Sequence, residues 1–482
     1  MLFSSVIFVF LFLPAVLFFY FIIPSKFLGL RNIVLLIFSL AFYFYGEPKY
    51  IAVMIFSILI NYIFGLIVQY AQEKNKKGNI IVILSVIINL AVLVYFKYLA
   101  FITENVNLIL KSQIIIPEII LPIGISFFTF QAMSYVFDIH GKKAKAQKNP
   151  LNVALYVCMF PQLMAGPIVR YETVSEEIRS RVFNLEDFSE GVIRFIYGLA
   201  KKIIIANAMG KISDDIFALS SGELSGKTAW LGAIAYSFQI FYDFSGYSDM
   251  AIGLGKIFGF HFLENFNFPY ISKSITEFWR RWHISLSSWF KDYVYIPLGG
   301  NRVGRFRNLF NILVIWLLTG FWHGAAWNFI VWGLYFAVIL ILEKVFLLKF
   351  LEKLNKRKIT VIFTHIYAII FIIIGWVIFR SENLTYALDF LSKMFSPSSV
   401  FSESGLDNQV RYYITQYLPE WILSVLFSIP AGKVLSKVWG KREKKSERIF
   451  YPLRAIYVCV IFGLSVLYMI GSSFNPFIYF RF

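Results

Sequence analysis

Long apolar stretches, separated by short segments rich in lysine and arginine, run through nearly the whole of this 482-residue chain. A helix that spans a bilayer needs about 20 mainly apolar residues. Such stretches are expected to be helical, because unpaired backbone groups are costly in hydrocarbon. The stretches that meet this requirement are residues 3–23, 30–45, 50–70, 80–100, 119–139, 189–209, 229–253, 309–325, 327–348, 359–379, 418–436 and 451–471.

The segment 151–168 is also apolar but is shorter, and it contains Pro161 and the pair Gly166-Pro167. Non-helical backbone at membrane depth is tolerated only where protein or a water-filled cavity covers it. We therefore expect a re-entrant segment here. Together with the spans, it predicts an all-α polytopic membrane protein with about 11–13 transmembrane or re-entrant helices.

Residues 254–308 differ, because aromatic and charged side chains are mixed within them. The aromatic residues recur at helical spacing, and Thr276 and Pro297 are suitable boundaries for a helix. We expect one amphipathic helix over 276–293, lying in the cytoplasmic interface rather than spanning. Its aromatic face comprises Trp279, Trp282, His283, Leu286, Trp289, Phe290 and Tyr293.

The orientation follows from the loops that carry the basic residues, which are expected to be cytoplasmic. The alternation holds if the N-terminus is outside and if 140–188 begins and ends inside. On that topology His323 lies toward the outer end of its span, and the tail 472–482 is extracytoplasmic. The basic clusters lie at residues 26–31, 74–77, 142–148, 302–307, 349–358 and 441–448.

Composition supports the membrane assignment, because 58% of the residues are hydrophobic and the mean hydropathy is +0.67, whereas soluble domains are about 45–50% apolar. The net charge of +18 is carried by short loops, so it indicates anionic lipid head groups rather than nucleic acid. The only two cysteines, Cys158 and Cys459, lie in apolar runs and predict no disulfide framework. The run 1–23 lacks a basic n-region and a cleavage site, and we expect an uncleaved span.

His323 is the first candidate for chemistry. No other His, Lys, Arg, Asp or Glu lies between Arg307 and Glu343. An ionised side chain at a bilayer centre costs roughly 2.5 kcal/mol or more, so a polar group there is a functional candidate. A neutral imidazole is cheaper to bury and still accepts a proton near pH 7. The alternative is a core histidine between Trp322 and Trp327, although Gly320 and Gly324 permit close backbone or ligand approach.

His283 is the second candidate, because Arg280 and Arg281 precede it. The planar guanidinium suits phosphate and carboxylate, which predicts an anion-binding surface at the membrane edge. The alternative is an interfacial histidine that pairs with a nearby carboxylate. The other three histidines are weaker candidates: we expect a solvated loop residue at His140, a structural role at His261 and an interhelical hydrogen bond at His365.

Two carboxylates, Asp243 and Asp249, lie in one predicted span. Their spacing of six residues places them on different faces of a helix, so they are not a paired acid–base site. Either carboxylate could order a histidine or an internal water, or could pair with an arginine. No metal constellation, nucleotide-binding loop or nucleophile elbow is present. A histidine base could instead remove a hydroxyl proton as an alcohol attacks a thioester.

The aromatic tail 475–482 is expected to dock in the bilayer or in the protein. On the predicted topology Tyr479 lies on the same side as His323. Its hydroxyl could serve as an acyl acceptor or relay.

Three motifs together resemble the membrane-bound O-acyltransferase family: Trp279–Ser287, Tyr242–Asp249 and Thr319–Gly324. The start 1–5 and the end 477–482 look like its bacterial branch, which O-acetylates alginate, peptidoglycan and related exopolysaccharides. The resemblance covers nearly the whole chain. It implies one acyltransferase domain over 1–482, with N-terminal helices 1–118, a family core 119–350, C-terminal helices 351–471 and the tail 472–482.

The resemblance also implies roles for individual residues. His323 matches the histidine where a cytoplasmic and an extracytoplasmic funnel meet, and His283 matches the second histidine near the cytoplasmic opening. Arg280, Arg281, Trp282, Trp322, Asp243 and Asp249 would bind the donor or support the site. Tyr479 matches the tail tyrosine that some relatives carry on a separate peptide, although Arg481 stands where that motif often has glutamine.

The function expected from these observations is O-acetylation of a cell-surface polysaccharide from the bacterial plasma membrane. No cofactor is bound, and the donor is acetyl-CoA or another cytoplasmic acyl thioester. The implied partner is an extracytoplasmic acetyltransferase resembling the SGNH hydrolases. The alternatives are transfer of D-alanyl or another short acyl group to a teichoic-acid-like polymer, a proton-coupled transporter or flippase, and a non-catalytic scaffold.

Overall fold

The computed structural model describes residues 1–357, 359–397, 407–430, 447–472 and 474–478. Throughout these residues the chain is helical or irregular, without strands, as the apolar pattern predicts. They form two compact units. The first unit comprises residues 1–195 and 247–263, and the second comprises 196–246 and 264–482. The expectation of one functional domain stays a prediction.

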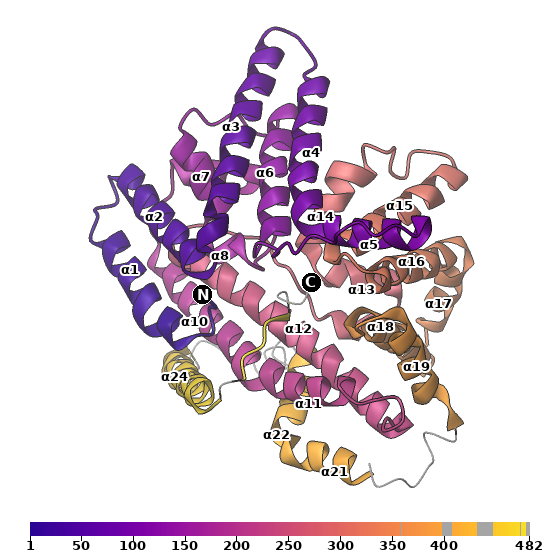
Figure 1. The fold of residues 1–482 in the computed structure, drawn as a ribbon. Coiled ribbons are helices and arrows are strands. Elements are labelled where there is room, and N and C mark those ends of the chain that lie inside the picture. The colour runs from indigo at the N-terminus through magenta and orange to yellow at the C-terminus, as the bar shows by residue number, and fades with distance from the viewer. Residues whose placement is uncertain (358, 398–406, 431–446, 473, 479–482) are drawn as a thin grey trace. The chain divides into compact units, whose positions relative to one another are not determined.

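The first unit is built around a group of apolar helices, in which α6 packs against both α3 and α4 (Figure 1). Polar side chains join these helices: the amides of Asn61 and Asn89 donate to each other's carbonyl oxygens at 2.9 Å in both directions. Such interhelical hydrogen bonds are typical of membrane helices. Its helices are η1 Phe8–Phe12, α1 Leu13–Phe21, α2 Leu28–Gly46, η2 Pro48–Tyr50, α3 Ile51–Glu73, α4 Asn79–Leu93, η3 Val94–Tyr98, α5 Leu99–Leu110, α6 Ile125–His140, α7 Pro150–Cys158, α8 Phe160–Leu163, α9 Tyr171–Arg179 and most of α10 Leu185–Ala200.

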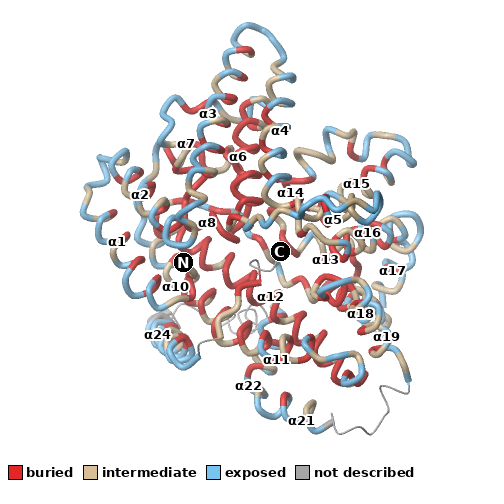
Figure 2. Tube along the Cα trace, viewed as in Figure 1, coloured by how far each residue is buried: buried red, intermediate tan, exposed pale blue. Residues whose placement is uncertain are grey.

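The second unit surrounds a core of aromatic side chains contributed mainly by α12, α13, α16 and α18. The long helix α12 is buried along most of its length (Figure 2), and the boundary between the units falls within it. The helices are η4 Lys201–Ala206, α11 Asn207–Phe217, α12 Gly226–Ile257, η5 Pro269–Ile271, α13 Ile275–Arg281, α14 Ile284–Phe290, η6 Lys291–Tyr295, α15 Arg305–His323, α16 Trp327–Leu342, η7 Glu343–Leu347, α17 Leu348–Leu354, α18 Val361–Arg380, α19 Leu384–Phe395, α21 Asp407–Gln416, α22 Leu418–Ser428 and α24 Glu447–Gly471.

Six of the described helical segments are long and apolar enough to cross a membrane. Their outer faces carry large exposed apolar side chains, such as Leu467 at 67% exposure on α24. A soluble surface rarely exposes so many such groups, whereas lipid covers them. The multi-pass membrane assignment is therefore confirmed. The segments are Leu28–Gly46, Pro48–Glu73, Asn79–Leu110, Trp327–Leu354, Val361–Arg380 and Pro452–Gly471.

Two segments that lie between the predicted spans contain helix. Within 102–117, α5 continues to Leu110, and within 380–417 the structure has α19 and α21. α19 buries only one of its faces, through Ala387, Phe390 and Met394. A search for continuous apolar runs misses helices of this kind, because only one face needs to be apolar.

The helix expected at 119–139 begins later, at Ile125. Gly124 precedes it with φ +76°, and a Cβ there would lie 2.8 Å from the carbonyl oxygen of Leu163. The segment 151–168 forms α7 and α8, which meet at Met159; the chain is buried from Leu155 through α8. Protein therefore covers this interrupted backbone, and its re-entrant character stays a prediction.

Candidate active site

His323 is the last residue of α15, where the chain turns back into α16. Two glycines allow these helices to approach closely. A Cβ at Gly320 would lie 2.4 Å from the carbonyl oxygen of Phe329, and one at Gly333 would lie 2.4 Å from that of Trp316. The expected close approach at Gly320 is therefore made by backbone, and it fixes where α15 presents its terminal imidazole.

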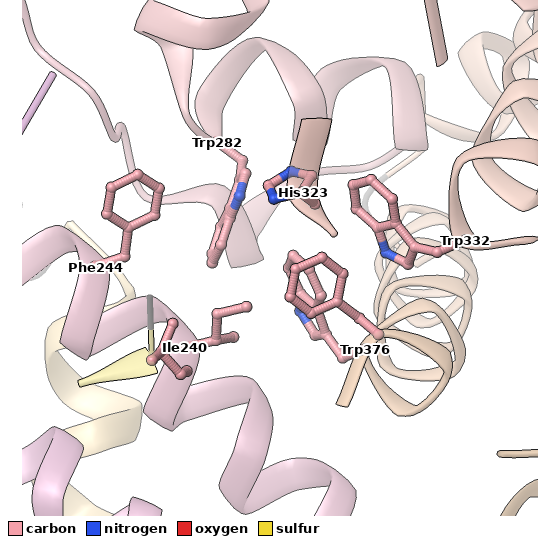
Figure 3. Close-up of a pocket in the computed structure, with 8 residues that line it drawn as sticks. Ile240, Phe244, Trp282, His323, Trp332 and Trp376 are labelled. Atoms are coloured by element: carbon pink, nitrogen blue, oxygen red, sulfur yellow. The ribbon is translucent and has the colours of Figure 1, made fainter. Parts of the chain in front are cut away.

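Aromatic rings surround the imidazole of His323 edge-on. The centroid of its ring lies 5.1 Å from those of Trp332 and Phe379, with interplanar angles of 83° in both cases. In Figure 3 it lies between Trp282 and Trp332. These rings enclose a cavity of about 20 Å³, and about 10–15 Å³ is enough for one water. The lining residues are Ile240, Phe244, Trp282, His323, Trp332, Trp376, Phe379 and Ile478.

A second, wider cavity of about 520 Å³ shares two of these wall residues, Phe379 and Ile478. Its lining is more polar, because it includes the ion pair between Arg380 Nη2 and Asp214 Oδ1 at 2.8 Å. The remaining lining residues are Tyr236, Ala326, Asn328, Phe329, Ser381 and Glu382. The imidazole thus faces a small apolar chamber whose wall is also the wall of a roomier polar one.

The second histidine lies at a break between helices, so the prediction of one continuous helix over 276–293 is wrong. α13 ends at Arg281 and α14 begins at Ile284, with His283 between them at φ +43°. The break is held by two backbone hydrogen bonds to the preceding loop, from Ile284 N to the oxygen of Asn265 and from Asn267 N to that of Arg281. This tertiary pairing overrides the helical spacing of the aromatic residues.

The start of α13 is also displaced from the predicted cap at Thr276. Ser274 is the N-cap, and its hydroxyl oxygen accepts a hydrogen bond from Glu277 N at 3.0 Å. Thr276 instead donates to the buried carboxylate of Glu343, through its amide at 2.8 Å and its hydroxyl at 2.6 Å. Ile275 N donates to the same carboxylate at 2.7 Å. A carboxylate at a helix N-terminus is stabilised by the exposed amides and the helix dipole.

The imidazole of His283 is almost fully buried, and its tautomer follows from its neighbours. The amide oxygen of Asn265 accepts hydrogen bonds from Ser285 N at 3.2 Å and Ser285 Oγ at 2.9 Å, and it lies 3.1 Å from His283 Nδ1. Nδ1 must therefore carry the proton, which leaves the lone pair on Nε2. Nε2 has no hydrogen-bond partner among the described residues. Burial lowers the pKa of His283 to about 3, so the ring is neutral at pH 7.

Trp322 connects the surroundings of the two histidines. The centroid of its ring lies 4.9 Å from that of His323 and 6.0 Å from that of His283. Phe244 of α12 packs edge-on against His283 at 4.6 Å and also lines the His323 cavity. The sequence motifs that contain the two histidines therefore meet at one aromatic cluster.

The two arginines before His283 differ in their surroundings. Arg281 Nη2 pairs with Glu277 Oε1 at 2.8 Å, and its Nη1 donates to the carbonyl oxygen of Asn267. The side chain of Arg280 is exposed. Arg281 therefore holds the break in place, and Arg280 is the more accessible cation for an anionic ligand.

The two carboxylates of α12 each pair with a basic residue. Asp249 lies in the first unit and pairs with Arg194 at 2.8 Å. Asp243 lies in the second unit and pairs with Lys202 at 2.6 Å, and both side chains are 3% exposed. These contacts correspond to the ion-pair alternative, although the partner of Asp243 is a lysine rather than an arginine.

The C-terminal segment, residues 474–478, packs on η4, α11 and α12 within the second unit, as its aromatic composition predicts. Asn207 Nδ2 donates to the oxygen of Phe474 at 3.2 Å, Lys202 Nζ donates to that of Pro476, and Ile478 N donates to Asp243 Oδ2 at 2.9 Å. Tyr479 and Arg481 lie outside the described residues, so the relay role of Tyr479 stays a prediction.

The other three histidines all make tertiary contacts, and the expectation of a solvated loop residue at His140 is wrong, because His140 is the last residue of α6. His365 Nδ1 lies 3.2 Å from the carbonyl oxygen of Ser272, which is the tertiary contact expected of it. His140 Nε2 lies 3.0 Å from the oxygen of Lys77 in a partly exposed position. His261 pairs with Glu177 and Asp187 at the surface of the first unit.

Sequence reasoning missed three polar residues that position the site: Lys202, Asn265 and Glu343. Each is at least 97% buried. Glu343 carried a usable signal, because a carboxylate that directly follows an apolar span needs a partner. Lys202 follows Lys201 and looks like part of an ordinary basic pair, and Asn265 lies in an irregular loop. No pattern distinguished the latter two from surface residues.

Comparison with known proteins gives a consistent result. The family model described as MBOAT, membrane-bound O-acyltransferase family, matches residues 38–386. Over the whole of both chains, the protein is 36% identical to the probable alginate O-acetylase AlgI of Azotobacter vinelandii. It is 33% identical to the peptidoglycan O-acetyltransferase of Helicobacter pylori, over 100% of this chain and 98% of that one.

A more limited likeness connects the chain with a third activity. It is 31% identical to the teichoic acid D-alanyltransferase of Bacillus subtilis, over 49% of this chain and 60% of that one. These matches agree with the all-helical membrane fold and with the motifs that meet at the aromatic cluster. The chain belongs to the membrane-bound O-acyltransferase family, and it is an acyltransferase.

Proposed function

We propose that this enzyme takes an acetyl group from a cytoplasmic thioester, acetyl-CoA or a similar donor, and passes it across the membrane for O-acetylation of a cell-surface polysaccharide. The observation that carries the proposal is the full-length likeness to an alginate O-acetylase and to a peptidoglycan O-acetyltransferase. The likeness to the D-alanyltransferase covers only about half of the chain, which makes acetyl the better supported cargo.

His323 is the proposed general base. Its imidazole takes the proton of an acceptor hydroxyl while that oxygen attacks the thioester carbonyl. The C–S bond then breaks, the thiolate leaves with a proton, and the acyl group becomes an ester. General-base help of this kind is worth about 10² to 10⁴ in rate. The apolar chamber around His323 supports this role, because a water-poor site strengthens polar interactions with the reacting atoms.

His283 is the proposed second catalytic residue, acting as a neutral hydrogen-bond acceptor through Nε2 rather than as a base. Its lowered pKa and the fixed tautomer support that assignment. Trp282 and Trp322 would shape the chamber, and Arg280 would attract the anionic part of the donor. Arg281, Asp243 and Asp249 would support the site through their ion pairs. The chain 1–482 would act as one catalytic domain.

The cellular setting completes the proposal. The basic loops favour the bacterial plasma membrane, with both termini outside and a funnel on each face that meet at His323. A relay through Tyr479 and an extracytoplasmic SGNH-hydrolase-like partner would then deliver the acetyl group to the polymer. The positive charge of the protein serves the lipid surface in this setting, not nucleic acid.

The test is His323→Ala in membranes supplied with isotopically labelled acetyl-CoA. The matched control is His140→Gln, because His140, like His323, is the last residue of a helix. We expect the first variant to lose acetylation while the polymer is still made and exported, and the control to keep it. Loss of export with normal acetylation would indicate the transporter. An unaffected His323→Ala variant would indicate a scaffold, and transfer of D-alanine but not acetate would indicate the other cargo.

A further inference from the structure

The C-terminal segment is held by a buried ion pair whose two members each bind its backbone. Lys202 Nζ lies 2.6 Å from Asp243 Oδ1 and also donates to the carbonyl oxygen of Pro476. The other carboxylate oxygen, Asp243 Oδ2, accepts from Ile478 N at 2.9 Å. Hydrogen bonds to charged groups are stronger than neutral ones. The cation thus faces a backbone acceptor, and the anion faces a backbone donor two residues further along.

Two further contacts, both made by Phe474, show the path of the segment. Asn207 binds the carbonyl oxygen of Phe474, and Lys211 Nζ lies 6.0 Å from the centroid of the Phe474 ring. The segment therefore runs from α11 to Asp243 on α12. It ends with the buried side chain of Ile478, which is 3% exposed.

The side chain of Ile478 lines two cavities. Its side chain and that of Phe379 line both the 20 Å³ cavity beside His323 and the 520 Å³ polar cavity. Two apolar side chains, one of them supplied by the docked segment, thus form a wall common to the two cavities.

We propose that Lys202, Asp243 and Asn207 form a latch that positions the C-terminal segment so that Ile478 closes the His323 cavity against the wide cavity. The latch residues are positioning residues, and none of them lines the His323 cavity. The functional part of the inference rests on the proposed acyl transfer at His323.

The closure has a chemical consequence. If Ile478 leaves the wall, water enters beside the imidazole and competes with the acceptor hydroxyl. Water then attacks the thioester carbonyl, the C–S bond breaks, the thiol leaves with one proton of the water, and acetate is released in place of the ester. A loosened latch should therefore raise hydrolysis relative to transfer, rather than lower both.

The first experiment measures docking without any use of activity. Lys211→Cys and Phe474→Cys are combined in a Cys459→Ser background, and a short thiol-specific crosslinker is applied to the purified full chain. The latch is then removed with Lys202→Met/Asp243→Leu, because replacing both members of a buried pair by apolar groups is often neutral for stability. Lys256→Met is the matched control, since Lys256 also lies on α12 and pairs with Glu190.

We expect the crosslink yield to fall about tenfold in the latch variant, the effect of losing one charge-assisted hydrogen bond, and to stay unchanged in Lys256→Met. An unchanged yield in a folded latch variant would overturn the proposal. If that variant does not fold, Asn207→Ala and Lys202→Arg keep the test open: the yield should fall in the first and be largely kept in the second. A crosslink yield that is kept in Asn207→Ala and falls in Lys202→Arg would also overturn the proposal.

The second experiment measures the ratio of thioester hydrolysed to acetyl transferred, in the latch variant and in Ile478→Ala. We expect the ratio to rise by about tenfold or more where water gains access, since desolvation of the site prevents such side reactions, and to stay constant in Lys256→Met. A parallel fall of both rates would contradict the closure. If wild-type protein consumes no thioester, the proposed function fails, while the crosslink still decides whether the latch exists.

Discussion

The surroundings of the two histidines differ, although both imidazoles lie beside Trp322. His323 ends a helix and lines a cavity, and its neighbours there are apolar and aromatic. His283 lies at a break between helices, buried, with Nδ1 hydrogen-bonded to Asn265. The first histidine has space for a reacting atom beside it, whereas the second has a fixed tautomer and a shifted pKa. Two histidines in similar tryptophan-rich motifs are thus suited to different tasks.

The largest effect that would sharpen this comparison is expected at His323. Replacement with alanine should lower acyl transfer by about 10² to 10⁴, because the proton acceptor is lost from the cavity. Thermal unfolding of the purified protein should change little by comparison. Transfer rates in membranes with labelled donor provide the measurement. A variant that keeps more than a tenth of the wild-type rate would contradict the base assignment.

A substitution at Glu343 tests how much its buried carboxylate, which binds the start of α13, contributes to the stability of the fold. Its carboxylate accepts from two amides and one hydroxyl at the start of α13 and from the hydroxyl of Tyr367. Glu343→Ala leaves these donors buried without a partner and should destabilise the protein by about 2–4 kcal/mol. Thermal unfolding in detergent measures this, with the exposed Glu352→Ala on α17 as the control. Equal midpoints for the two variants would show that this carboxylate is dispensable.

His283→Asn separates the structural and catalytic roles of the second histidine. Asparagine accepts a positive φ readily, and its amide can still donate to Asn265, so stability should stay within about 0.5 kcal/mol. The substitution removes the Nε2 acceptor of the imidazole. The rate of acyl transfer should therefore fall by about tenfold to a hundredfold, as expected when a reactant is misplaced. The unfolding midpoint and the transfer rate are measured on the same sample. Unchanged transfer would assign His283 a structural role alone.

The smallest effect is expected at His261, which lies outside the comparison. The hydrogen bond to Glu177 raises the pKa of this surface histidine above its ordinary value. Its stabilising contribution is therefore complete below about pH 6.5, the unfolded pKa, and is lost as pH rises through the higher folded pKa.

Because the His261 side chain is 53% exposed, solvent screens the pair, and exposed pairs contribute about 0–1 kcal/mol. Raising the pH from 6 to 9 should lower the unfolding midpoint of wild-type protein by about 1–2 °C more than that of His261→Gln. Added salt should reduce this difference. Identical pH profiles for the two proteins would exclude the contribution.

Much of the helical arrangement follows from the sequence, because membrane helices must be long and apolar. The spans around α2, α3, α16 and α18 were predicted close to their observed bounds. The failures have a common cause. The one-sided burial of α19 and the break at His283 depend on neighbours outside the local sequence, such as the loop with Asn265, and a local pattern contains no information about them.

The candidate site shows the same division. The sequence singles out His323, because an ionisable group is costly to bury within an apolar run. The structure places this residue at a cavity. Lys202 did not stand out, because nothing in its local sequence indicates that it binds Asp243 and the backbone at Pro476. Residues that act by position are visible only after the chain has folded.

The glycine contact between α15 and α16 has a practical consequence for anyone who engineers this enzyme. Replacing helical glycine by alanine is a common route to thermostability, since it lowers the entropy of the unfolded chain. At Gly320 and Gly333 a single methyl group would collide with the facing carbonyl oxygens and push the hairpin apart. These two glycines should therefore be kept when the protein is engineered for stability. An alanine at either position would favour the helix itself but would displace the imidazole of His323.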